Sequence, residues 1–129
     1  MFANTPLSAA LPASDLERAK KWYSEKLGLQ PVSEDEYGGA QYEAGGTQFL
    51  VYPSAFAGTN KATAAGFSTE NFDEMIEELR AKEVTFEDVD FGDMGKTVDG
   101  VFSSPDGTKV AWFKDSEGNI LALNTMPPG

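Results

Sequence analysis

The sequence predicts an α+β domain of two helices and eight short strands. These elements form two successive modules, each in the order β-α-β-β-β. Three observations lead to this prediction: two capped amphipathic segments, eight strand-like segments separated by turn residues, and a constant shift that superimposes the two helical segments. The 129 residues match the usual size of one domain. We therefore treat residues 1–129 as a single domain, with one module at about 5–54 and a second at about 61–126.

The first helix is predicted over residues 15–27. Ser14 and Glu17 form a capping box, in which Ser14 accepts a hydrogen bond from an early backbone N–H and Glu17 reaches back. Apolar residues then recur at spacings of three and four and form one stripe: Leu16, Ala19, Tyr23 and Leu27. Trp22 lies beside this stripe and is expected to pack in the core. Gly28 provides a left-handed stop at the C-terminal end.

The second helix is predicted from Asn71, a capping residue with Glu74 three positions later, to about Lys82. Its apolar side carries Phe72, Met75, Ile76 and Leu79. A shift of 56 positions superimposes the first helix on the second and places Lys26 on Lys82. This correspondence predicts an internal duplication.

The eight strands are predicted from short segments bounded by glycine-containing turns, at residues 7–11, 29–36, 40–44, 48–52, 62–68, 84–90, 110–114 and 120–124. The shift between the two halves grows to 71 positions at the last strands, from Phe49 to Ile120. The second half therefore contains 15 extra residues, which we place in a loop or hairpin within 91–108.

Composition excludes several classes of protein. The formal net charge is -11, from 21 acidic and 10 basic residues, so the surface is expected to repel nucleic acids and anionic membranes. Hydrophobic residues at 40% and aromatic residues at 12% are too frequent for a disordered acidic chain. No apolar run approaches the roughly 18 residues of a membrane span. A folded, cytoplasmic protein is therefore expected.

The chain contains neither cysteine nor histidine. The absence of cysteine excludes disulfides and thiolate chemistry. The absence of histidine excludes the Ser-His-Asp triad, histidine general bases and the common histidine-containing metal sites. No catalytic residue is predicted on these grounds.

Two motifs resemble the vicinal oxygen chelate superfamily, which includes glyoxalase I, extradiol dioxygenases, fosfomycin-resistance enzymes and bleomycin-resistance proteins. The first is Leu-Pro-Ala-Ser-Asp-Leu-Glu-Arg-Ala at 11–19, followed by Trp22-Tyr23. The second is the run 111–121, in which Ser116 stands where the family usually has proline. The resemblance covers nearly the whole chain and implies a curved mixed eight-stranded sheet around a cavity. It also implies a homodimer, formed by side-by-side module pairing or by strand exchange.

Metal-using members of this superfamily take two inward-facing ligands from the first and last strands of each module, usually His, Gln or Glu. The resemblance places these positions at Ser8, Val51, Ala64 and Ala122. One hydroxyl and three hydrocarbon groups cannot replace the coordination shell of a divalent cation. A slip of one residue adds only the neutral hydroxyls of Tyr52 and Thr63. We therefore expect neither a metal site nor another cofactor.

The resemblance retains the cavity, and we expect it to be an apolar pocket. The predicted ligand-binding residues are Ser8, Tyr42, Phe49, Val51, Ala64, Trp112 and Ala122. Strand alternation brings either Trp112 or the neighbouring Phe113 into the cavity, without deciding which. It likewise points either Tyr42 or Glu43 inward, and an inward Glu43 would be suited to general-base chemistry.

The leading hypothesis is a metal-independent protein that binds a small apolar or cationic molecule, such as an antibiotic or a toxic metabolite. The acidic segment 70–93 then acts either as an electrostatic funnel for a cation or as a solvated surface. The alternative is a metal-dependent lyase, isomerase or dioxygenase with an atypical ligand set, and a third hypothesis is an interaction domain. The sequence leaves open whether the protein is an enzyme.

Overall fold

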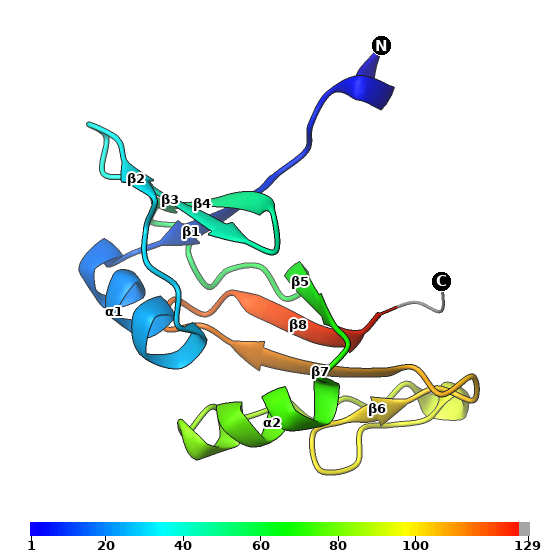
Figure 1. The fold of residues 1–129 in the computed structure, drawn as a ribbon. Coiled ribbons are helices and arrows are strands. Elements are labelled where there is room, and N and C mark those ends of the chain that lie inside the picture. The colour runs from blue at the N-terminus through cyan, green and yellow to red at the C-terminus, as the bar shows by residue number, and fades with distance from the viewer. Residues whose placement is uncertain (127–129) are drawn as a thin grey trace.

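The structure is a computed structural model that describes residues 1–126. Within that range the chain forms two α-helices and eight strands in the predicted order, which confirms the α+β fold class (Figure 1). Two short 3-10 helices, Phe2–Asn4 and Gly92–Met94, are additional. The first half contains β1 (Ala9–Ala13), α1 (Leu16–Leu27), β2 (Ser33–Glu34), β3 (Ala40–Ala44) and β4 (Thr47–Pro53). The second half contains β5 (Thr63–Thr69), α2 (Phe72–Ala81), β6 (Phe102–Ser103), β7 (Lys109–Lys114) and β8 (Ile120–Thr125).

Hydrogen bonding divides the strands into two four-stranded sheets, β1-β4-β3-β2 and β5-β8-β7-β6. In each sheet the first and last strands of that half, β1 with β4 and β5 with β8, pair in parallel, and the other pairs are antiparallel. The two sheets adjoin at β1 and β5, so the expected eight-stranded sheet consists of two repeats that are not hydrogen-bonded into one. Figure 1 shows the first sheet above the second, with α2 below.

The strand predicted at 84–90 is wrong. Val84 is buried and Phe86 packs its ring edge-to-face on Phe113 at 5.9 Å. The segment pairs only through isolated bridges, such as the one between Phe86 and Phe113 of β7, and forms no continuous strand. The counterpart of β2 is instead β6, inside the segment predicted as the insertion. Twenty residues separate α2 from β6, but only five separate α1 from β2, which places the insertion at 82–101.

The N-cap of the first helix lies one residue later than predicted. Asp15, not Ser14, is the N-cap, and its carboxylate accepts a hydrogen bond from the Arg18 N–H at 3.1 Å. Ser14 instead donates to Glu117 at 3.3 Å. The predicted stop is confirmed, because Gly28 has a φ of 69° at the end of the helix. In α2, Asn71 is the N-cap without a side-chain hydrogen bond.

The core lies between the helices and one face of each sheet. Tyr23 of α1 packs against the rings of Tyr42 and Phe49, with centroids 5.5 and 5.9 Å apart. We call this the helix-covered face, and the opposite side of each sheet the helix-free face. The buried strand residues of the helix-covered face are Leu11, Ala13, Ala40, Tyr42, Phe49, Val51, Ala111, Phe113, Leu121 and Leu123. Neither helix in the described range is long and apolar enough to span a membrane.

Candidate functional site

Strand pairing distributes the predicted ligand-binding residues over both faces of the sheets. Val51 pairs with Leu11, and Phe49 pairs with Tyr42, all on the helix-covered face. Tyr42 and Val51 are fully buried and Phe49 is 7% exposed, so these three residues belong to the core. These three residues therefore do not line one cavity with Ser8, as the sequence had predicted. Side chains alternate along a strand, so an assignment that is off by one residue on β4 places every side chain on the wrong face.

The remaining predicted residues differ in their surroundings. Ser8 precedes β1 and is exposed. Ala64 lies at an irregularity of β5, between Thr63 and Ala65. Trp112 and Ala122 are paired neighbours on the helix-free face of the second sheet. Of this pair, Trp112 is partly exposed, whereas Ala122 is 6% exposed.

The residues at the expected metal positions do not fit a divalent cation. On β4, the residue that shares the helix-free face is Leu50 rather than Val51, so the four positions hold Ser8, Leu50, Ala64 and Ala122. This set supplies one hydroxyl and no carboxylate or imidazole. Within residues 1–126, no three acidic side chains gather closely enough to share a metal ion.

Three aromatic side chains form a patch on the helix-free face of the second sheet. The ring of Phe91 lies 5.7 Å from Trp112 and 5.1 Å from Phe102, measured between centroids. Phe91 is 41% exposed and Trp112 is partly exposed, whereas Phe113 is 1% exposed in the core. Trp112 is therefore the member of the pair that faces outward. We call Phe91, Phe102 and Trp112 the aromatic patch.

Small residues lie directly beside the indole of Trp112. Trp112 pairs with Ala122, which pairs with Gly66 on β5, so one row across three strands carries an indole, a methyl group and a hydrogen. A Cβ added at Gly66 would approach only to 3.6 Å of Asn124 and 3.8 Å of Ala122, which is ordinary van der Waals contact. The small residues therefore leave room beside the ring for a flat molecule.

A polar pair borders the same surface. Asn124 of β8 donates from Nδ2 to Ser68 Oγ of β5 at 2.9 Å, one row away from Ala122 and Gly66. Asn124 Oδ1 faces Gly66, where an added Cβ would contact it. The face therefore combines aromatic stacking with neutral groups that accept or donate hydrogen bonds.

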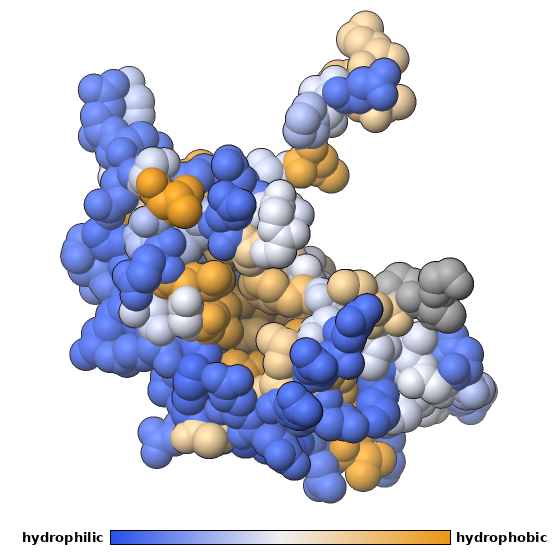
Figure 2. All heavy atoms as spheres, in the orientation of Figure 1, coloured by the Kyte–Doolittle hydropathy of each residue, from blue (hydrophilic) through white to orange (hydrophobic). Residues whose placement is uncertain are grey.

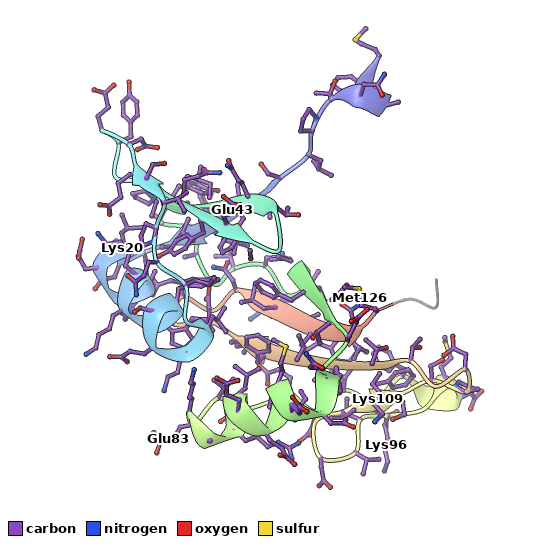
Figure 3. All side chains as sticks on the ribbon, in the orientation of Figure 1. Lys20, Glu43, Glu83, Lys96, Lys109 and Met126 are labelled. Atoms are coloured by element: carbon purple, nitrogen blue, oxygen red, sulfur yellow. The ribbon has the colours of Figure 1, made fainter. Side chains whose placement is uncertain are left out.

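Other expected site residues lie elsewhere. Glu43 is on the helix-free face of the first sheet, beside Gln48, and is exposed on β3 (Figure 3). Trp22 packs as expected, with its ring 6.3 Å from Phe113. Sequence patterns did not identify Phe91, Phe102 or Asn124 as site residues, because the contact between the insertion and the sheet leaves no periodic signal.

A buried acidic network joins the two halves at the turn between β7 and β8. The fully buried side chain of Glu117 accepts hydrogen bonds from Arg18 Nε at 2.8 Å and from the Asp15 N–H at 2.9 Å. Burial raises the pKa of Glu117, but the hydrogen bonds from Arg18, Ser116 and the Asp15 N–H outweigh it and lower the pKa to about 2. The network therefore fixes the N-terminal end of α1 on the second half.

Asp115 provides a second connection from the same turn to α1. Tyr23 donates from its hydroxyl to Asp115 Oδ2 at 2.6 Å, and Asn119 Nδ2 donates to the same oxygen at 2.9 Å. Burial raises the pKa of Tyr23, and the neighbouring Asp115 charge adds to this effect. The phenol therefore remains a donor, and its contact with Asp115 holds α1 against the second half.

An empty space lies on the helix-covered side. An open cavity of about 220 Å³ lies where α1 and α2 approach each other, and Figure 2 shows the hollow with apolar residues gathered inside it. Of the residues predicted to line a cavity, this one is lined only by Phe113, the alternative to Trp112 on β7. The expected pocket position and this cavity are thus on different sides of the second sheet.

Comparison with known proteins agrees with this architecture. The family model described as the Glyoxalase/Bleomycin resistance protein/Dioxygenase superfamily matches residues 6–121. No match was found among curated proteins.

Similar solved structures cover nearly the whole chain. A lactoylglutathione lyase from Agrobacterium tumefaciens has a TM-score of 0.72 at 17% identity, covering 97% of this chain and 96% of that one. A superfamily member from Sphaerobacter thermophilus has a TM-score of 0.71 at 21% identity, covering 98% and 100%. A fosfomycin resistance protein from Listeria monocytogenes has a TM-score of 0.72 at 11% identity, covering 96% and 94%. Since the family match spans most of the chain, the protein belongs to the Glyoxalase/Bleomycin resistance protein/Dioxygenase superfamily.

Proposed function

We propose that this protein binds a flat small molecule on the helix-free face of its second sheet, without a metal ion. The observation that carries the proposal is the row formed by Trp112, Ala122 and Gly66, in which an accessible indole borders two of the smallest side chains. The aromatic patch extends the stacking surface through Phe91 and Phe102. Stacking on such a surface requires no catalytic group.

The chemistry of the surrounding residues supports an apolar or cationic ligand. The positions that would hold a metal carry hydrocarbon groups and one serine, as described above, which favours binding over metal-dependent lyase, isomerase or dioxygenase chemistry. The net charge of -11 favours a cation over an anion at this exposed face. An antibiotic or toxic metabolite with a planar aromatic system and a positive charge has the required chemistry.

We propose that the protein acts as a homodimer in the cytoplasm. Phe2 and Leu7 are 78% and 92% exposed, on an N-terminal segment that extends away from the rest of the chain (Figure 1). A second copy would bury these side chains. The fold contains no cysteine and therefore needs no oxidising compartment.

Proflavine, a planar aromatic cation, tests the proposed face by isothermal titration calorimetry. Replacing Trp112→Ala is expected to weaken binding by about tenfold, because stacking on the indole is lost. Trp22→Phe is the matched control and is expected to leave the affinity unchanged. In the Trp22→Phe background, Trp112 is the sole tryptophan, so quenching of its fluorescence by proflavine reports contact directly.

Two results would overturn the proposal. Equal affinity of proflavine for the wild type and for Trp112→Ala would remove the aromatic patch from the binding site. A stoichiometric divalent ion, found by elemental analysis of gently purified protein, would contradict metal independence. Unchanged circular dichroism of Trp112→Ala shows that any loss of binding is local.

A further inference from the structure

The cavity between the helices is separate from the binding face proposed above. It opens between the C-terminal part of α1 and one side of α2, and its floor comes from β3, β5, β7 and β8. The apolar lining residues are Leu27, Leu29, Ala44, Phe67, Met75, Leu79, Phe113 and Leu123. Both halves of the chain contribute, so the cavity forms only when α1 and α2 are docked on their sheets.

Its volume admits a compact organic molecule. An apolar cavity of about 150 Å³ is enough to bind benzene. At about 220 Å³, the cavity accommodates a chain or ring system of roughly eight or nine carbon atoms on the same scale. The space therefore exceeds what a packing defect left by one side chain would provide.

A cation without a carboxylate partner lies at the edge of this cavity. Lys26 Nζ donates to the backbone carbonyl of Lys82 at 2.5 Å, and no carboxylate lies within 4.0 Å of it in the described part of the chain. The side chain of Lys82 differs, because it pairs with Glu78 at 3.3 Å. The excess charge at the edge is therefore positive, although the chain as a whole carries -11.

The predicted internal duplication accounts for the position of Lys26 at the cavity edge. Lys26 and Lys82 are 56 positions apart, which is the shift that relates the two helices; Lys26 lies in the last turn of α1, and Lys82 is the C-cap of α2. The C-terminal ends of the two helices therefore meet at the cavity edge, where the carbonyl oxygens attract an ammonium group. The ammonium of Lys26 has three donors, so the contact with Lys82 leaves donors available for a ligand.

We propose that this cavity binds a small amphiphilic monocarboxylate, with its aliphatic or aromatic body inside and its carboxylate on Lys26. The apolar lining accepts the hydrocarbon part, and the lysine selects the charge of the polar end. An ammonium ligand of the same size would be repelled by the positive charge of Lys26. It would also find no free carboxylate at the cavity edge, because Glu78 is already paired with Lys82. The site is separate from the aromatic patch and does not depend on the function proposed for that patch.

Octanoate tests the proposal, with octan-1-ol and octylammonium as probes of equal chain length. We expect octanoate to bind at least tenfold more tightly than octan-1-ol in calorimetry, and octylammonium to bind most weakly. Lys26→Met retains an apolar stem and is expected to lower octanoate affinity to that of octan-1-ol. Lys21→Met is the matched control on the same helix, since Lys21 is an exposed lysine that does not line the cavity.

Filling the cavity provides a second variant. Ala44→Phe places a ring where the ligand body would lie, and we expect it to abolish binding of both octanoate and octan-1-ol. Circular dichroism and thermal unfolding establish that the variant is folded. If Ala44→Phe does not fold, the comparison of Lys26→Met with Lys21→Met still decides the charge recognition.

Amide chemical shifts locate the bound octanoate. Changes around Leu27, Ala44 and Met75 are expected, and Trp112→Ala is expected to bind octanoate as the wild type does. Equal binding by Lys26→Met and the wild type would overturn the proposal, as would changes confined to Trp112. Absence of octanoate binding, together with a concentration-dependent dimer that protects these same amides, would assign the cavity to a second copy of the chain instead.

Discussion

At the scale of single residues, the most informative group is the carboxylate of Glu117. Its side chain is fully buried, yet it remains ionised because Arg18, Ser116 and the Asp15 N–H all donate to it. The sequence identified Ser14 and Glu17 as an intrahelical cap, but Ser14 contacts Glu117 instead. No sequence pattern signals a partner about one hundred positions away, so this part of the structure was not predictable from local rules.

Stability is expected to depend on Glu117 in a defined pH range. The folded pKa of about 2 lies below the ordinary value of 4.5, so the ionised carboxylate stabilises the fold above about pH 4.5. This contribution, about 2 to 3 kcal/mol, is lost as the pH falls from about 4.5 to about 2. Urea unfolding should therefore show that the free energy lost in Glu117→Gln is large at pH 7 and shrinks towards pH 2.

The control for this experiment is Glu17→Gln, because the side chain of Glu17 is 82% exposed. Its free energy of unfolding is expected to stay within about 0.5 kcal/mol of the wild type across the same range. A difference between Glu117→Gln and the wild type that does not change with pH would contradict the assigned ionisation.

At the scale of elements, helices were predicted more completely than strands. The stripe with a period of 3.6 residues and Gly28 defined α1 nearly to the residue, because the helix determines which side is buried. Side chains of a strand alternate between its two faces. When the residues on both faces are apolar, the sequence does not determine which set points to the core. The run Phe49–Leu50–Val51–Tyr52 is such a case: the sequence predicts Val51 on the ligand side, but the structure places Leu50 there.

Aspartate substitutions at two adjacent positions of β4 test which of its side chains point to the core. Val51→Asp would bury an unpaired carboxylate where the side chain is fully buried, and we expect it to cost more than about 4 kcal/mol or to unfold the protein. Leu50→Asp places the same group on the helix-free face, with an expected cost of about 1 kcal/mol. Thermal unfolding of the two variants decides the facing, and equal destabilisation would contradict the pairing of β4 with β1 and β3.

At the scale of the whole molecule, the sequence indicated the fold and the family, because capped helices, turns and duplication all agree. It did not locate the binding surfaces. The aromatic patch depends on the docking of residue Phe91 from the insertion against Trp112, and the cavity depends on how α1 and α2 meet. Both arise from contacts between distant segments, for which composition and periodicity carry no information.

The net charge is a property of the whole molecule that the sequence does determine, and it predicts a salt dependence. A charge of -11 raises the local concentration of a cation and is screened over about 10 Å at 0.1 M salt and about 3 Å at 1 M. The affinity for proflavine is therefore expected to fall several-fold between 0.02 and 0.5 M sodium chloride, estimated roughly from this screening. Acridine has the same ring system and is neutral at pH 7.5, so its affinity should stay nearly constant in the same titration. If both ligands respond equally to salt, the acidic surface does not steer the ligand, and stacking on Trp112 alone accounts for binding.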